Sequence, residues 1–361
     1  MSPLQEYYAT STFWAETRKQ VQDVVAKELQ EHYQSPVESP SAAVREFDSD
    51  KVIWIDQLSR LHTLLSDTGT RVGIPIPQKP RFGTLPLGSV NAMILTVPGS
   101  AERLVVFNDG LFLFVHLFVK IMVLCFQELA PARAMLGKKK TAAAMQKAIA
   151  SRLPPEAHVH FHDLLCAYVL RGHPGKASPW LLPAKVASIQ ELLLTACELF
   201  VLSHEYGHIV TEQNTSVNNA EVLTWADLAA VRRNFTREMQ ADFWGANLTL
   251  LGIPGKGNMP YAFAGIEIFF QGAEMVERAL SILENGIEGG AEGQTHPPSN
   301  DRRIMLRRSL VREWGPNMAQ VFGLGNTVIA ICETLWAKER KFFLDKWVEG
   351  VKPARIWTAL A

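Results

Sequence analysis

Cysteine is scarce in this chain, and neither sign of charge is in excess. Four cysteines occur among 361 residues, far apart and without Cys-x-x-Cys spacing, so we expect neither a disulfide framework nor a cysteine-ligated zinc site. Lysine plus arginine balance aspartate plus glutamate at 36 each, which leaves no overall field that favours nucleic acid. The sequence therefore predicts buried thiols in a reducing compartment and no nucleic-acid partner.

Targeting and membrane signals are also missing. The first residues, MSPLQEYYATSTFW, have neither a basic head nor an apolar stretch, so we expect no signal peptide and a cytoplasmic location. The most apolar stretch, Leu111–Phe126, contains His116 and Lys120 and is shorter than the roughly twenty residues that a span requires. We interpret it as a core helix and expect no integral membrane span.

A histidine pair closes a second apolar run, from about Ala187 to Val210, in which apolar residues recur at helical spacing. On a helix, His204 and His208 lie four residues apart on one face, so both can bind one metal ion. Glu205 is rotated off that face toward the open coordination position, where a general base is expected.

A second helical stretch supplies carboxylates at the same spacing. Glu238 and Asp242 lie at i and i+4, again on one face. Catalytic zinc normally has three protein ligands and one open position, so Glu238 is the candidate third ligand. Asp242, one turn further, can accept a hydrogen bond from the outer nitrogen of a liganding histidine. The sequence thus predicts one zinc ion bound by His204, His208 and Glu238.

These two segments, HEYGH at His204–His208 and EMQAD at Glu238–Asp242, resemble those of the gluzincin metallopeptidases. Two further elements are similar to the group that contains HtpX and the CAAX prenyl proteases. One is QTHPPSNDR at Gln294–Arg302, and the other is the pair of strand-like segments at Val90–Met93 and Leu104–Leu111.

The resemblance implies a zinc-dependent endopeptidase that acts on a protein or peptide substrate. It nominates His296 and Arg302 as donors to the developing oxyanion or as support for it. A structural carboxylate such as Asp242 is the alternative partner of Arg302. Within the enzyme class, the missing membrane span also fits the Lit-type phage-exclusion proteases, whereas a different class would be a catalytically inert, zinc-stabilised interaction protein.

The expected fold is α+β and mainly α, with a zincin-like core, a small β-hairpin or sheet, and additional helices at both ends. We expect an N-terminal helical region over 1–75, a metallopeptidase core over 76–310 with an insertion at about 127–186, and C-terminal helices over 311–361. Short β-prone runs at Val90–Val97 and Leu104–Asn108 predict the hairpin. The proline-rich segment Gly73–Val90 predicts an irregular path.

The insertion raises two further expectations. His158, His160 and His162 alternate as they would on one face of a strand, which leaves a second metal site as an alternative to a polar strand face. A proline-rich loop with Trp180, together with the glycine-rich Gly286–Gly293, suggests a lid. We therefore expect an activity restrained until the substrate or an unidentified regulatory partner binds.

Overall fold

The structure, a computed structural model, describes residues 52–74, 76, 81–85, 92–96, 103–129, 147–214, 228–289 and 297–354. It confirms the α+β, mainly helical class. Of the helical region predicted over 1–75, residues 1–51 lie outside the described residues. The elements that position the site are α4 (Val52–Val72), β1 (Arg81–Leu85), β2 (Ala92–Thr96), β3 (Arg103–Asn108), α5 (Asp109–Leu129), α8 (Pro155–Val169), α9 (Ala187–Asn214), α10 (Leu228–Gly252), α11 (Met259–Asn285), α12 (Ser299–Trp314) and α13 (Met318–Val348).

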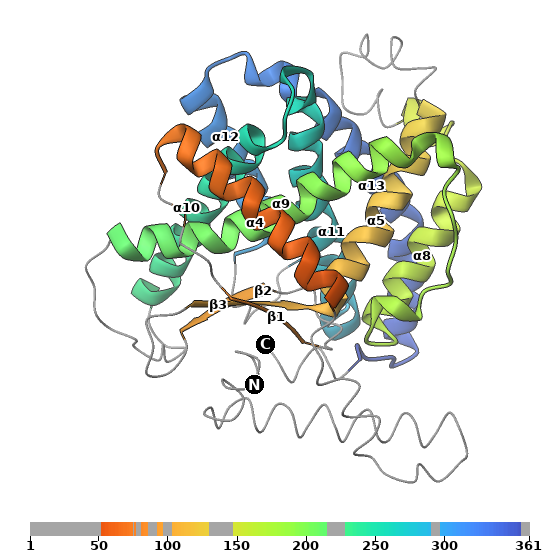
Figure 1. The fold of residues 1–361 in the computed structure, drawn as a ribbon. Helices are drawn as coiled ribbons and strands as arrows, with labels where there is room; N and C mark the ends of the chain where they lie inside the picture. The colour runs from red at the N-terminus through yellow and green to blue at the C-terminus, as the bar shows by residue number, and fades with distance from the viewer. Residues whose placement is uncertain are drawn as a thin grey trace, which may run out of the picture.

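The three strands form one small sheet in the order β1-β3-β2. Strands β2 and β3 pair antiparallel, from Ala92 opposite Phe107 to Thr96 opposite Arg103, which confirms the predicted hairpin. In Figure 1 the sheet lies at one edge of the helical body, with α4 and α9 above it. Strand β3 is buried along most of its length, so it joins the sheet to the helical core.

The irregular path predicted for Gly73–Val90 is wrong over Arg81–Leu85. These five residues form β1, which pairs parallel to β3 with Arg81 opposite Leu104 and Leu85 opposite Asn108. Pro80 and Pro86 flank the strand, so the local composition favours a loop. The hydrogen bonds of β3 override that preference, and a long-range pairing of this kind has no local signal.

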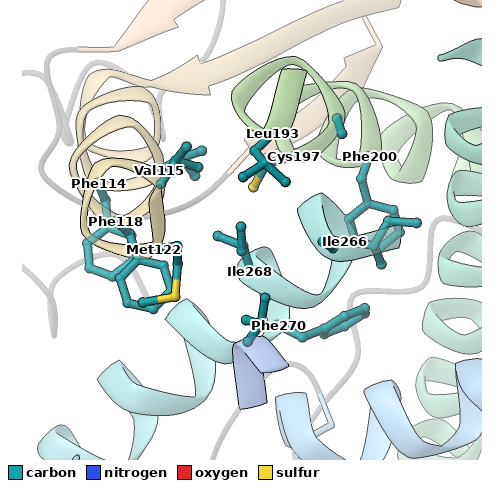
Figure 2. Close-up of a cluster of buried hydrophobic side chains, with 14 of the residues drawn as sticks. Phe114, Val115, Phe118, Met122, Leu193, Cys197, Phe200, Ile266, Ile268 and Phe270 are labelled. Atoms are coloured by element: carbon teal, nitrogen blue, oxygen red, sulfur yellow. The ribbon is translucent and has the colours of Figure 1, made fainter. Parts of the chain in front are cut away.

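One continuous hydrophobic core extends from α4 to α13. Figure 2 shows its centre, where Phe114 and Phe118 of α5 face Leu193 and Cys197 of α9 across Ile268 of α11. Helix α11 packs against both α9 and α13, while α4 packs on α9 and α10. The helix with the histidine pair is thus enclosed by its neighbours. The cysteines are free, and all except the partly buried Cys166 are buried, as predicted.

The strand predicted for His158, His160 and His162 is wrong, because all three lie on α8. The helix begins at Pro155 with an acidic residue in its first turn, and its buried residues recur at helical rather than alternating spacing. His162 Nδ1 lies 2.7 Å from Glu339 Oε2 on α13, and His160 stacks on Trp180. Among the described residues, no metal-ligand group includes these histidines.

Helix α5 spans 21 residues, so the predicted extent of Leu111–Phe126 is too short and length does not argue against a span. By length and composition alone, three helical stretches of the described chain are apolar enough to cross a membrane: Asp109–Leu129, Ala184–Thr211 and Met318–Val348. Most of the α5 window, 72%, is buried within the protein. Its buried Lys120 donates a hydrogen bond to the main-chain oxygen of Trp180 and lies over the Trp180 ring.

Candidate metal centre

Helices α9 and α10 carry the predicted ligands and pack unusually closely. A Cβ atom added to Gly207 of α9 would lie 2.7 Å from the Cα atom of Ala241 on α10. One added to Gly245 of α10 would lie 2.9 Å from the main-chain nitrogen of His204. Glycine at both positions removes the Cβ atoms that would hold the two backbones apart. Helix α9 continues through Gly207 to Asn214, past the apolar run that ends at about Val210.

The three predicted ligands meet where these helices approach. The Nε2 atoms of His204 and His208 are 3.2 Å apart. Glu238 Oε2 is 3.5 Å from His204 Nε2, and Glu238 Oε1 is 3.5 Å from His208 Nε2. The structure thus brings together the three side chains that the helical spacing indicates, with ligand atoms all within 4.8 Å of one another.

Each of these separations is close to that between two ligands of tetrahedral zinc, with the two Glu238 distances made by different carboxylate oxygens. Ligand atoms about 2.0–2.2 Å from zinc at tetrahedral angles lie roughly 3.3–3.6 Å from one another. Two imidazole nitrogens and a carboxylate oxygen are also ligand types that zinc accepts. In addition, Glu238 and Asp242 are buried carboxylates that share the Arg302 guanidinium, and Glu205 beside them in the chain is buried too, so a divalent cation would compensate negative charge here.

Asp242 contacts His204 on the side away from its ligand atom. Its Oδ1 atom lies 2.9 Å from His204 Nδ1. An Nδ1–H that donates to this carboxylate leaves the Nε2 lone pair directed at the other ligands. Asp242 also accepts two hydrogen bonds from Arg302, from Nε at 2.8 Å and from Nη2 at 2.6 Å. Arg302 therefore holds the carboxylate that orients His204.

Burial and neighbouring charges shift the pKa values of His204 and His208 in opposite directions. Burial opposes protonation of His204, but the hydrogen bond and charge of Asp242 outweigh it and raise the His204 pKa. Burial, together with repulsion from His204, lowers the His208 pKa to about 4. Burial also opposes ionisation of Asp242, yet the charge and hydrogen bonds of Arg302 lower the Asp242 pKa. Asp242 thus stays ionised as the partner of His204.

Tyr206 fixes the histidine-bearing turn of α9 against α4, and Glu205 lies next to it in the chain. Glu205 is 8% exposed and follows the first ligand directly, so its side chain leaves the helix about 100° around the axis from that ligand. Tyr206 is fully buried, and its hydroxyl lies 2.8 Å from His62 Nδ1 of α4. Burial raises the Tyr206 pKa, so the phenol stays protonated and can donate to His62.

Of the two residues that the resemblance nominates for the oxyanion, the structure describes only Arg302. His296 lies outside the described residues. Arg302 is 8% exposed and forms its short contacts with Asp242, while its Nη2 atom is 3.3 Å from Glu238 Oε2. These contacts match the alternative in which a structural carboxylate is the partner of Arg302. Arg302 thus contacts both Asp242 and Glu238.

Sequence reasoning missed two kinds of residue at this centre. One is the glycine pair, Gly207 and Gly245, for which glycine in the interior of two helices was the available signal. The other is Glu277 of α11, whose carboxylate accepts hydrogen bonds from Ser299 at the start of α12. No sequence spacing links Glu277 to the candidate ligands, because only the packing of α11 against α12 brings it near them.

Comparisons with known proteins add no relative: no protein-family model, no curated protein and no solved structure matches this chain.

Proposed function

We propose that this protein is a zinc-dependent endopeptidase of the gluzincin type, with a zincin-like core. The observation that carries the proposal is the convergence of His204, His208 and Glu238, whose ligand atoms lie within 4.8 Å of one another and can bind one ion. Glu205 follows His204 in the chain and is buried, which supports a role as the general base.

The chemistry divides among the residues of the chain. A zinc ion bound here would polarise a peptide carbonyl and acidify a water molecule. The Glu205 carboxylate would accept the proton of that water and later deliver it to the leaving amine nitrogen. Asp242 keeps the Nδ1 proton of His204 in place, and Arg302 keeps Asp242 ionised. His296, which the family resemblance nominates, would stabilise the oxyanion.

An inert, zinc-stabilised interaction protein is the competing class. A purely structural zinc site normally has four protein ligands, whereas the donor group found in the described residues has three. A structural role also requires no general base next to the ligands. The three-donor set with an adjacent buried glutamate therefore favours an enzyme.

The proposal includes restraint of the activity. His204 is 9% exposed and Glu238 is 6% exposed, so a substrate has limited access to the ligands in this conformation. The His208 side chain, at 24%, is the most open of the three. Binding of a specific substrate or partner would then open or complete the site. We expect weak cleavage of unfolded casein-like proteins and strong cleavage of a specific target.

The experiment is metal analysis of the purified protein combined with profiling of new protein termini in cells. Wild-type protein should contain one zinc per chain, and His204→Ala should contain none. Glu205→Gln should keep the zinc and the fold but lower cleavage about 10²–10⁴-fold or more, because the amide keeps the shape and cannot accept the proton. Equal cleavage by wild type and Glu205→Gln would instead support the inert protein.

A further inference from the structure

Glu277 forms the main side-chain contact to the first residue of α12. Its Oε1 atom accepts a hydrogen bond from the Ser299 hydroxyl at 2.6 Å. The main-chain nitrogen of Ser299 also donates to this carboxylate, at 3.1 Å to Oε2 and 3.3 Å to Oε1. Ser299 is 4% exposed, so water competes little for these bonds. Both oxygens of Glu277 thus fix one residue.

The beginning of α12 depends on this external carboxylate. The residue before the helix is Pro298, which forms no side-chain capping bond to it. The first main-chain N–H groups of a helix have no partner within the helix and favour a nearby negative charge. Glu277 supplies that charge from α11. The position of the first turn of α12 is therefore set by α11.

That first turn carries Arg302. The main-chain nitrogens of Asp301 and Arg302 both donate to the Pro298 carbonyl, so Ser299 and Arg302 belong to one rigid turn. The Glu277 charge also helps to raise the pKa of Arg302, although burial opposes this rise most strongly. The guanidinium thus lies within the electrostatic reach of Glu277 as well as in contact with Asp242.

We infer that Glu277 is a positioning residue of the metal centre: it fixes the start of α12, which places Arg302 on Asp242 and thereby orients His204. This inference rests on the proposed zinc site. The continuous series of contacts runs from Glu277 through Ser299 and the first turn of α12 to the ligand. A carboxylate that only joined α11 to α12 would affect stability and leave zinc affinity unchanged.

Helix α11 offers a matched control. Glu267 is 1% exposed and accepts a hydrogen bond at 2.6 Å from Nε of Arg307, also on α12. Arg307 lies more than one turn beyond Arg302, and it also donates a hydrogen bond to Asn326 of α13. Glu267→Gln therefore removes the charge of another carboxylate that joins the same two helices. Glu267 Oε2 also lies 3.8 Å from Arg303 Nη1, but its short contact is to Arg307 and not to Ser299 or Arg302.

The test measures the zinc dissociation constant of the full-length protein by competition with a chelator. Glu277→Gln should weaken zinc binding up to about tenfold, less than the 10–100-fold loss for a direct contact of a ligand, because Glu277 acts through the first turn of α12. Glu267→Gln should lower stability to urea and change zinc affinity less than about twofold. In any cleavage assay, the loss for Glu277→Gln should be in kcat rather than in KM.

Ser299→Ala provides a second variant if Glu277→Gln does not fold. It removes the 2.6 Å hydroxyl bond and keeps the main-chain bonds. Its zinc affinity should therefore be several-fold lower than that of wild type and clearly lower than that of Glu267→Gln. Folded Glu277→Gln or Ser299→Ala that binds zinc as tightly as wild type would overturn this inference and leave the proposed function standing. Wild-type protein that takes up no zinc would overturn the proposed function, and the inference with it.

Discussion

Replacing Gly207 by alanine tests whether the close approach of α9 and α10 creates the metal centre. The new Cβ atom would lie 2.7 Å from the Ala241 Cα atom and 2.8 Å from the Ala241 main-chain oxygen. Both are backbone atoms of a packed helix, so neither can rotate away as a side chain would. The helices must separate until the contact reaches at least the ordinary 3.4 Å.

The size of the effect follows from these distances. Widening the contact from 2.7 Å to 3.4 Å is a shift of about 0.7 Å. Applied to the 3.5 Å separations between Glu238 and the histidines, it gives about 4.2 Å, beyond the roughly 3.6 Å that tetrahedral zinc permits. Overpacking of this kind costs about 1–3 kcal/mol, against a gain of about 1 kcal/mol from the better helix propensity of alanine.

Gly323→Ala is the matched control, because Gly323 lies inside α13 and an added Cβ there meets nothing within 4 Å. The control should raise the free energy of unfolding by up to about 1 kcal/mol and leave zinc affinity unchanged. Gly207→Ala should lower the free energy of unfolding and weaken zinc binding at least about tenfold.

Stability is measured by urea unfolding of the metal-free proteins, and zinc affinity by chelator competition. If Gly207→Ala were stabilised like Gly323→Ala, the α9–α10 contact would not be as close as described. If it were destabilised but bound zinc normally, this contact would not set the ligand geometry.

Two further substitutions test individual buried carboxylates. Asp242→Asn should weaken zinc binding about 10–100-fold, because it disturbs the hydrogen bond that orients His204. It should also destabilise the protein by about 3–5 kcal/mol, because Arg302 stays buried without its main counter-charge. Normal zinc affinity of this variant in chelator competition would contradict the prediction. Burial raises the pKa of Glu198 from 4.5 to about 7, despite the hydrogen bond from Gln57, so the native protein holds this proton more tightly than the unfolded chain. The free energy of unfolding of the wild type should therefore fall as the pH rises from about 4.5 to 7. Over that range, urea unfolding should show the stability of Glu198→Gln rising by on the order of 3 kcal/mol relative to wild type. Parallel pH profiles of the two proteins would refute the raised pKa of Glu198.

The ligand set was accessible from the sequence because its spacing is local. His204 and His208 share a helix face by period alone, as do Glu238 and Asp242. The long apolar helices α5 and α11 and the β2–β3 hairpin also have strong local patterns. What those patterns predict is the existence of each element and the direction in which its side chains point.

The features that the sequence did not reveal depend on contacts between distant segments. Strand β1 exists through its pairing with β3, and Glu277 contacts the centre through the start of α12. The α8 histidines differ, because both signals there are local: their alternation predicts a strand, whereas the spacing of the buried apolar residues around them predicts the helix that forms. For β1 and Glu277 the deciding interaction joins residues far apart in the chain.

The ligand set described above is divided between two helices, with both histidines on α9 and the glutamate on α10. An ion bound there would act as a cross-link, and its binding free energy would add to the stability of the folded chain. At a free zinc concentration 1,000 times the dissociation constant this linkage amounts to about 4 kcal/mol. Zinc supply would then govern how long the protein survives proteolysis, so under the proposed function depletion of the metal would remove the protein together with its activity.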